Sequence, residues 1–366
     1  MREPVDLRRR RILAAVQARG SARVRDLAAE LQVSVVTVRR DVEELTREGR
    51  LRRGHGVVRS TLPAQELPES GAADGDTVAV VVPERHSCLY ETLHGARTAL
   101  EAAGLRIALH IAPQVPGAER PQVERALADG ARGVLLAPRW RSTADEEADH
   151  GWLAALGVPL VLMERRPPRG SALHAVDSVC SDHWYGAHLA VDHLVRLGHR
   201  RILFATRDDS PTARTLRAAL CEIAAAHPLV EDWAWTLSSP SAGVGTPDAE
   251  DASPDPTDLL RRLGATAAVL HGDVDALMLV QQLAGEGVRV PEDCSVIAYD
   301  DVVAGLGTPP LTAVSPPKDE VGRVAAELLL GRLDGGRAGA ARPAQRVELL
   351  PALTVRGSTR KRVSEA

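Results

Sequence analysis

Cysteine, aromatic residues and long hydrophobic runs are all scarce in this chain. The four cysteines lie far apart, at Cys88, Cys180, Cys221 and Cys294, and none belongs to a C-x-x-C pair. This spacing argues against a zinc site or a disulfide framework and favours reduced thiols in a cytosolic protein. No stretch approaches the roughly eighteen apolar residues of a membrane helix. The first residues carry an arginine run rather than an apolar signal region. We therefore expect a soluble, cytoplasmic protein with no membrane partner.

Lysine is absent from the first sixty residues, which are nevertheless strongly basic. They contain 15 arginines and 8 acidic residues, a net charge of +7, whereas the rest of the chain has a net charge of −11. A basic head on an acidic body predicts a polyanionic partner at the head alone, because the body would repel phosphates. The length of 366 residues and the 44% hydrophobic content allow two or three domains. Aromatics make up only 2%, so alanine, leucine and valine must build the core.

Residues 24–58 have the pattern of a helix–turn–helix followed by a basic hairpin. We expect a short helix, a turn at residues 32–33, a longer helix over residues 34–48, and a hairpin over residues 51–58. In the longer helix the apolar residues recur at positions i, i+4 and i+7, which predicts a core-facing stripe. That stripe consists of Val38, Val42 and Leu45. The opposite stripe consists of Val36, Arg40, Glu43 and Arg47.

A helix that buries one stripe and exposes small residues and arginines on the other fits the major groove of double-stranded DNA. Arginine reads guanine edges there with two hydrogen bonds. The alternative is an ordinary amphipathic helix with a solvated charged face. The helix–turn–helix spacing and the R-R-G-H-G hairpin favour DNA binding over that alternative. The residues that we expect to contact DNA are Ser34, Val35, Val36, Thr37, Arg39 and Arg40 of the helix, and Arg52, Arg53 and His55 of the hairpin.

The motifs S-V-V-T-V-R-R-D-V-E-E-L and L-R-R-G-H-G resemble the winged helix–turn–helix of DeoR-type bacterial repressors. The resemblance covers about residues 7–58 and implies a DNA-binding domain over residues 1–58. Two positions depart from the family. Gln32 occupies the turn where the family usually has glycine, and Arg23 stands where the preceding helix usually has a capping hydroxyl. The next residues, 59–76, contain two prolines and two glycines, which predicts a linker.

From residue 77 the pattern changes to continuous apolar runs that alternate with helical segments. The first set includes T-V-A-V-V-V-P, G-V-L-L-A-P and V-P-L-V-L-M-E, and a second set begins near residue 182 with R-I-L-F-A-T, A-A-V-L-H-G and S-V-I-A-Y-D. Continuous apolar strands between helices predict parallel sheets covered on both faces. Two successive sets predict an α/β body of two similar, doubly wound lobes, with a ligand in the cleft where the carboxyl ends of the strands meet.

The body resembles the LacI-type effector domain, which is similar to periplasmic sugar-binding proteins. The matching segments include V-P-L-V-L-M-E-R-R-P, H-L-A-V-D-H-L-V-R-L-G-H-R-R-I and G-V-R-V-P-E-D-C-S-V-I-A-Y-D-D. The resemblance runs over about residues 77–359. We expect lobe 1 at about residues 77–178 plus 302–330, and lobe 2 at about residues 179–301 plus 331–359. The hinge helix that joins head and body in ordinary LacI-type proteins is missing, so their coupling mechanism cannot be transferred.

The resemblance implies an effector site at the ends of two strands. Glu164 ends V-L-M-E and Asp300 ends V-I-A-Y-D. The family has acids there that accept hydrogen bonds from ligand hydroxyls, and carboxylates suit a polyol because they only accept. The alternatives are a surface ion pair between Glu164 and the arginines that follow it, and a helix cap formed by Asp300 and Asp301.

Other effector candidates come from four further segments. The family's ligand-clamping arginine falls in T-A-R-T-L-R, but an ungapped alignment places leucine at that position. Either of the two arginines in this segment could therefore take that role. A tryptophan matches an aromatic residue that covers one face of the ligand, although packing alone would also explain it. The segment H-G-D replaces the family's A-N-D, and the loop after the first strand should reach the cleft. These candidates are Arg85, Tyr90, Arg214, Arg217, Trp233 and Asp273.

Motifs for catalysis and cofactors are missing. The chain has no Walker A loop, no G-x-S-x-G and no H-E-x-x-H, and its glycine-rich segment at residues 331–339 follows no apolar strand and is predicted to be a loop. His188, Asp192 and His193 share a predicted helix, but no third ligand follows at metal spacing. We therefore expect no cofactor and no metal.

These observations predict a non-enzymatic transcriptional regulator, most simply a repressor, that responds to a sugar or sugar derivative. We expect it to bind its operator as a homodimer, since one small head offers few contacts for tight, specific binding. The alternative is an enzyme acting on a sugar phosphate, because the bodies of ordinary DeoR-type proteins resemble sugar-phosphate isomerases. The segments V-P-E-D-C-S-V and Y-D-D favour the binding-protein-like body.

Overall fold

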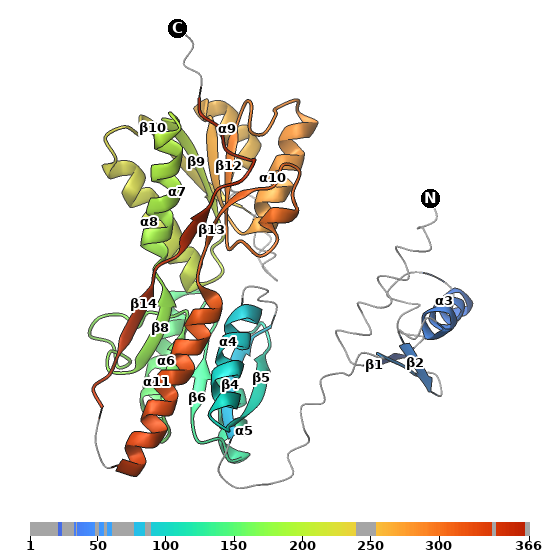
Figure 1. Cartoon of the computed structure of the whole chain (residues 1–366), viewed down its shortest axis with the longest axis vertical. Helices are drawn as coiled ribbons and strands as arrows, with labels where there is room; N and C mark the ends of the chain where they lie inside the picture. The colour runs from blue at the N-terminus through green and yellow to red at the C-terminus, as the bar shows by residue number, and fades with distance from the viewer. Residues whose placement is uncertain are drawn as a thin grey trace. The chain divides into compact units, whose positions relative to one another are not determined.

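The computed structural model of the chain describes residues 21–23, 33, 35–47, 51–54, 57–60, 77–84, 89–238, 254–338 and 342–362. The chain divides into two compact units, Met1–Ala73 and Asp74–Ala366. Unit 1 is the basic head, and unit 2 contains both six-stranded sheets of the protein (Figure 1).

Unit 1 combines helix α3, Val35–Arg47, with a three-stranded antiparallel sheet of order β1-β3-β2. Its strands are β1 (Ser21–Arg23), β2 (Leu51–Gly54) and β3 (Val57–Ser60). The predicted stripe of α3 is the buried one, since Val38, Val42 and Leu45 are at most 1% exposed. The hairpin of β2 and β3 confirms the predicted wing, and β1 adds a strand that the sequence did not predict. The short helix expected from residue 24 lies outside the described residues.

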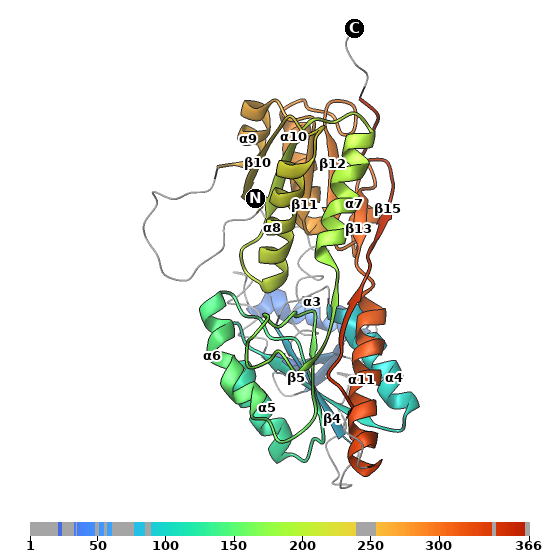
Figure 2. The same ribbon diagram turned by 90° about the vertical axis from the view of Figure 1, so that its left-hand side faces the viewer.

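Lobe 1 of unit 2 is a fully parallel sheet of order β14-β8-β7-β6-β4-β5. Figure 2 shows α5 and α6 on one side of this sheet and α4 and α11 on the other. The apolar runs form the central strands because both faces are covered, and Val78, Val80 and Leu135 are at most 1% exposed. The elements are β4 (Thr77–Pro83), α4 (Leu89–Ala102), β5 (Arg106–Ala112), α5 (Glu119–Ala128), β6 (Val134–Leu136), α6 (Thr143–Ala154), β7 (Leu160–Met163), β8 (Asp177–Ser181), α11 (Lys318–Ala338) and β14 (Arg346–Leu349).

Lobe 2 repeats this plan with a sheet of order β10-β9-β11-β12-β13-β15. Helices α7 and α8 share one apolar core with the sheet, and α9 and α10 share the core on the other face. The double winding was predicted, but this sheet is mixed, because β15 runs antiparallel to β13. The elements are α7 (His183–Arg196), β9 (Arg201–Thr206), α8 (Pro211–Ala226), β10 (Asp232–Leu237), α9 (Pro256–Leu263), β11 (Ala267–His271), α10 (Asp273–Gly285), β12 (Ser295–Tyr299), the 3-10 helix η1 (Ala304–Leu306), β13 (Thr312–Ser315) and β15 (Ala352–Thr354).

The chain passes between the lobes three times, at Asp182, at residues 316–317 and at residues 350–351. The predicted lobe boundaries after residue 301 place β13 and β14 in the wrong lobes, whereas most of α11 and all of β15 lie in the predicted lobes. Strand β13 belongs to lobe 2, whereas α11 and β14 belong to lobe 1, and β8 also completes lobe 1. Figure 1 shows α11 and β14, both red, beside the elements of lobe 1. The prediction did return the chain to lobe 1 and then to lobe 2, but it placed both returns about 15 to 20 residues too early.

The glycine-rich segment at residues 331–339 was also predicted wrongly, because α11 continues through Ala338. Glycine weakens a helix by about 1 kcal/mol relative to alanine, and contacts within this segment oppose that cost, since Leu333 packs against the core of lobe 1 and Arg332 pairs with Asp177. Helix α11 lies against α4 with its glycine Gly322 beside the Thr92 carbonyl, so close that an added Cβ would lie 1.9 Å from that oxygen. Val321, Ala325 and Leu329 are fully buried along the same face.

Candidate functional site

The carboxyl ends of the strands of both lobes surround two adjoining cavities. The larger one has a volume of about 190 Å³ and the smaller one about 60 Å³. Residues of both lobes line each of them, and Glu164, Arg165, His183 and Thr212 line both. The predicted ligand cleft between the lobes therefore corresponds to a two-chambered cavity.

Backbone strain is concentrated at the same strand ends. Four described residues other than glycine have a positive φ: Trp140 (34°), Glu164 (53°), Asp300 (107°) and Asp301 (55°). Trp140 lies in the loop after β6, Glu164 directly follows β7, and the two aspartates follow β12. Such conformations cost of the order of 1–3 kcal/mol each and cluster at binding and catalytic sites. These four residues change the direction of the backbone at the strand ends that face the cleft.

Glu164 is held by the neighbouring strand end. Its side chain is 11% exposed and accepts hydrogen bonds from the Ser181 amide (3.1 Å) and the Ser181 hydroxyl (2.9 Å). His183 Nε2 lies 3.6 Å from its second oxygen. Burial opposes ionisation, but the nearby His183 ring and the hydrogen bonds from Ser181 outweigh it and lower the pKa of Glu164. The alternative of a surface ion pair does not describe this buried carboxylate, which carries a negative charge in the cleft.

Asp300 faces the smaller chamber from lobe 2. Lys318, the first residue of α11 and only 4% exposed, places Nζ 3.8 Å from the Asp300 carboxylate and also donates to the Asp300 carbonyl. Burial raises the pKa of Asp300, and the Lys318 cation opposes that rise. The cleft thus contains two carboxylates from opposite lobes, one with a lowered and one with a raised pKa.

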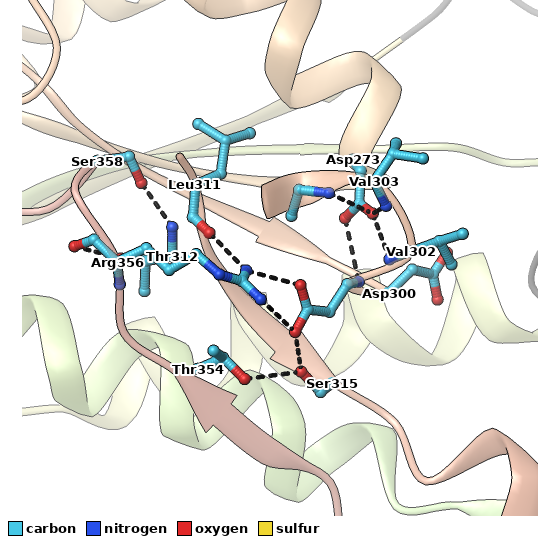
Figure 3. A network of polar contacts seen from close by, with 12 residues as sticks. Asp273, Asp300, Val302, Val303, Leu311, Thr312, Ser315, Thr354, Arg356 and Ser358 are labelled. Atoms are coloured by element: carbon cyan, nitrogen blue, oxygen red, sulfur yellow. Dashed lines mark hydrogen bonds and ion pairs between the residues drawn. The ribbon is translucent and has the colours of Figure 1, made fainter. Parts of the chain in front are cut away.

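Asp273 supports Asp300 rather than lining either chamber. Its carboxylate accepts four backbone N–H groups of residues 301–304, at 2.6–3.1 Å. Figure 3 shows Asp273 beside this turn, and on the other side of it Arg356, whose guanidinium makes two hydrogen bonds to Asp301 (2.6 and 3.0 Å). The expected contact of Asp273 with the ligand is not seen, because its oxygens are occupied by the turn. The alternative of a helix cap does not describe Asp301, which pairs with Arg356.

Only one of the two candidate arginines of α8 lies at the cavities. Arg214 lines the larger chamber and crosses to lobe 1, where it contacts the Trp140 and Arg141 carbonyls and Glu146. Arg217 lies outside both linings, with its guanidinium 4.8 Å from the centre of the Trp235 ring. A single helical turn separates the two side chains, which explains why the sequence left the choice open.

Trp233 was predicted at the cleft and lies elsewhere. It is the second residue of β10 and pairs with Ile202 at the amino end of β9, whereas the cavities lie at the carboxyl ends. Its ring packs 6.1 Å from that of Phe204 in the core of lobe 2. Tyr90, at the start of α4, is 75% exposed and lines neither chamber, although its neighbours Leu89 and Thr92 line the smaller one. Arg85 lies outside the described residues.

Sequence reasoning missed a buried chain of polar rings beneath the cleft. His183 Nδ1 lies 3.0 Å from the Tyr299 hydroxyl, and the ring of His271 stands perpendicular to Tyr299 at 6.5 Å. Burial lowers the pKa of His271 to about 4, so it is neutral at pH 7. His271 Nδ1 and the Thr92 hydroxyl, both lining the smaller chamber, are buried without a hydrogen-bond partner in the structure. Such atoms can bind a polar ligand. The signal that could have found His183 is its place directly after a strand end, in S-D-H.

The candidate DNA-reading face of α3 is exposed. Val36 is 62% exposed and, with the exposed Arg40, faces away from the buried stripe, while the exposed Arg39 and the partly exposed Thr37 flank them on either side. Val35 begins the helix, and Arg52 and Arg53 lie on β2 opposite Arg59 and Val58 of β3. Ser34 and His55 lie outside the described residues. The exposed residues therefore form one surface at the start of the helix.

The three residues that share a predicted helix and could in principle bind a metal each contact another side chain. His188 stacks on Trp184, Asp192 pairs with Arg196, and His193 lies 3.0 Å from the Thr359 hydroxyl. In the described part of the chain, no group of three or more His, Cys, Asp or Glu side chains could hold a metal ion. Within the same residues, no helix is both long and apolar enough to span a bilayer.

Comparison with known proteins finds two family matches. Residues 8–63 match the DeoR-like helix-turn-helix domain, and residues 191–359 match the periplasmic binding protein-like domain. The arabinose metabolism transcriptional repressor of Geobacillus stearothermophilus is 26% identical over 326 residues, which cover 84% of each chain. The ribose operon repressor of Escherichia coli is 30% identical over 212 residues, 55% of this chain and 58% of that protein. The chain thus spans little more than half the length of this second relative.

The fold agrees with these matches. The lac repressor dimer bound to operator and the anti-inducer ONPF superimposes with a TM-score of 0.63 at 21% identity, over 79% of this chain and 96% of that one. The relatives are repressors rather than enzymes, and the two-lobed body counts against the alternative of a sugar-phosphate isomerase. Both predicted resemblances are confirmed. The chain is a transcriptional regulator that joins a DeoR-like helix-turn-helix domain to a LacI-type, periplasmic-binding-protein-like effector domain.

Proposed function

We propose that this regulator is a repressor whose affinity for operator DNA is controlled by a sugar bound between the lobes of unit 2. The observation that carries the proposal is the pair of carboxylates, Glu164 and Asp300, which enter one cleft from the strand ends of opposite lobes. A ligand that contacts both favours the closed arrangement of the lobes over the open one. Binding energy is thereby linked to the arrangement of the body.

The chemistry of the lining supports a polyol. Carboxylates accept hydrogen bonds from hydroxyl groups, while Arg207 and the neutral ring of His271 offer further polar atoms in the smaller chamber. The acidic and basic side chains of that chamber are equal in number, which suits a ligand without net charge. They are Glu164, Asp209 and Asp300 against Arg165, Arg207 and Lys318. The relatives named for arabinose metabolism and the ribose operon point to the same class of ligand.

DNA recognition is assigned to the exposed start of α3. Val36, Thr37, Arg39 and Arg40 would enter the major groove, and the β2–β3 wing would contact phosphates or the minor groove. The net charge of +7 over the first sixty residues supports this role.

We further propose that the protein binds its operator as a homodimer through the outer face of α10. Val274 and Met278 are one turn apart on this helix and are 55% and 56% exposed, and Leu306 and Val302 nearby are 81% and 40% exposed. A cluster of exposed apolar side chains on a soluble lobe is typical of an interface. Closure of the lobes within each protomer would then alter the spacing of the two heads and hence the affinity for paired half-sites.

A ligand screen on the full chain tests the proposal. Its thermal unfolding would be measured with pentoses, hexoses, nucleosides and purine bases, and DNA selected from a random library would serve as the operator. We expect a neutral sugar to raise the melting temperature and to change DNA affinity. If only a purine or nucleoside stabilises the protein, the proposal that the effector is a sugar is wrong. If the protein turns over a sugar phosphate, the proposal that it only binds its ligand is wrong.

A further inference from the structure

We propose that Arg214 is a bridge that holds the two lobes of unit 2 in the closed arrangement, and that this bridge sets the affinity of the cleft for its effector. The inference rests on the effector cleft proposed above. It assigns to Arg214 a positioning role in place of the ligand-clamping role that its sequence motif implies.

The contacts of Arg214 run from one lobe to the other. Arg214 belongs to α8 of lobe 2, and its Nη1 donates to the carbonyls of Trp140 and Arg141, both at 2.8 Å. These carbonyls lie in the loop between β6 and α6 of lobe 1. Its Nη2 lies 3.4 Å from Glu146 on α6, a carboxylate that is 9% exposed. One guanidinium thus makes three contacts with the opposite lobe, two of them with backbone atoms.

In lobe 1, the loop that accepts the hydrogen bonds of Arg214 is held in place by its own contacts. Trp140 has a φ of 34° and is 3% exposed, and its indole donates to Asp149 at 2.8 Å. The same carboxylate accepts from the Trp152 indole at 2.8 Å, so the loop is tied to α6. Ser142 then begins α6 with a complete capping box. A loop fixed at both ends keeps its two carbonyls directed at the guanidinium with little further loss of entropy.

The residues of the bridge belong to no crossover between the lobes. Two other polar contacts between the lobes, His183 with Glu164 and Lys318 with Asp300, involve residues next to crossovers. Contacts beside a hinge change little in length when the lobes rotate. Arg214 instead ties α8 to the loop and helix on the opposite side of the larger chamber. A rotation that moves α8 away from α6 would break the contacts of Arg214.

Charge favours the same closed arrangement. Burial is the main effect that raises the pKa of Glu146, and Arg214 is the strongest of the positive charges that oppose it. Without Arg214 the closed state would enclose a carboxylate that has lost its nearest cation. Closure is thus favoured by the bridge and disfavoured when the bridge is removed.

The effector gains affinity from a cleft that is already closed. Apparent affinity is the intrinsic affinity multiplied by the fraction of molecules in the competent arrangement. A variant whose closed fraction falls tenfold should therefore bind effector about tenfold more weakly, although it has lost no contact with the effector.

The test measures the distance between the lobes in the full chain without any effector. Spin labels would be placed at Ala128→Cys on α5 and Ala225→Cys on α8, both exposed, in a background carrying Cys88→Ser and Cys221→Ser. Labelled protein diluted with an excess of unlabelled protein would be examined by double electron–electron resonance. The bridge variant is Arg214→Gln.

Arg217→Gln is the control, because it removes an arginine from the same helix that stacks on Trp235 within lobe 2. We expect wild type and control to give the same short distance and Arg214→Gln to give a longer one. An unchanged distance in Arg214→Gln, or an already long distance in wild type, would overturn the proposal. If Arg214→Gln does not melt cooperatively, Arg214→Lys and Glu146→Gln decide by the same criterion. Because no effector is used, a failure of the sugar assignment would leave this result unaffected.

Discussion

The turn that presents Asp300 depends on one buried carboxylate, and its removal should have a large effect. Asp273 is 4% exposed and accepts the backbone N–H groups of residues 301–304. An orphaned buried donor costs about 1–3 kcal/mol. Water can reach part of the turn, since Val302 is 40% exposed. We therefore expect Asp273→Ala to lower the free energy of unfolding by roughly 3 kcal/mol, less than the sum over four donors.

Differential scanning calorimetry of the full chain checks this magnitude. For a body of this size 1 kcal/mol corresponds to about 2–4 °C, so the melting temperature should fall by roughly 6–12 °C. Asp273→Asn should fall between wild type and Asp273→Ala, because one amide oxygen can still accept the three N–H groups that share Oδ2. Glu124→Gln, which removes an exposed carboxylate from α5, should melt as wild type does. If Asp273→Ala also melts as wild type does, the turn does not depend on this carboxylate.

Three further predictions follow from the charges and thiols described above. Arg40→Ala should weaken operator binding about 10- to 100-fold without changing effector affinity, as measured by fluorescence anisotropy and calorimetry; unchanged operator affinity would contradict the assignment of α3. Burial raises the pKa of Asp300, whereas hydrogen bonds lower that of Glu164 against the effect of burial, so Asp300 takes up a proton first as pH falls. Effector affinity should therefore drop through the raised pKa of Asp300, and Asp300→Asn, but not Glu164→Gln, should abolish that step in a pH titration. Burial raises the pKa of Cys180 and Cys294 to about 12, so neither should be alkylated by iodoacetamide at pH 8 in the folded protein, and labelled peptides in a mass spectrum would show otherwise.

The spacing of apolar residues correctly predicted the buried side of a helix and the strands that are continuously apolar. The stripe of Val38, Val42 and Leu45 identified the buried side of α3, and runs such as residues 77–83 identified central strands. Strand β8, D-S-V-C-S, was missed because its sequence is largely polar, although all five residues are buried between neighbours in the sheet. The last two turns of helix α11 were missed because glycines disfavour a helix there, whereas contacts made far away in the sequence, such as Arg332 with Asp177, support it.

The sequence predicted the site residues that lie at the ends of strands. It did not predict the contacts that form only because the two lobes lie close together. Glu164 and Asp300 were found because parallel strands bring their carboxyl ends together. Trp233 was misplaced because position within a strand, not residue type, decides which end a side chain occupies. The carbonyl groups that receive Arg214 carry no sequence signal, since any residue could supply them.

The threefold passage of the chain between the lobes has a consequence for biosynthesis. Lobe 1 receives α11 and β14, and lobe 2 receives β15, only from the last fifty residues. Neither sheet can be completed until the segment that carries α11, β14 and β15 has left the ribosome. The two lobes of unit 2 are therefore completed late in synthesis and together. A message broken before codon 316 would yield a basic head with no working receptor attached. Such a product would keep the DNA-contacting residues of the head and would not respond to an effector.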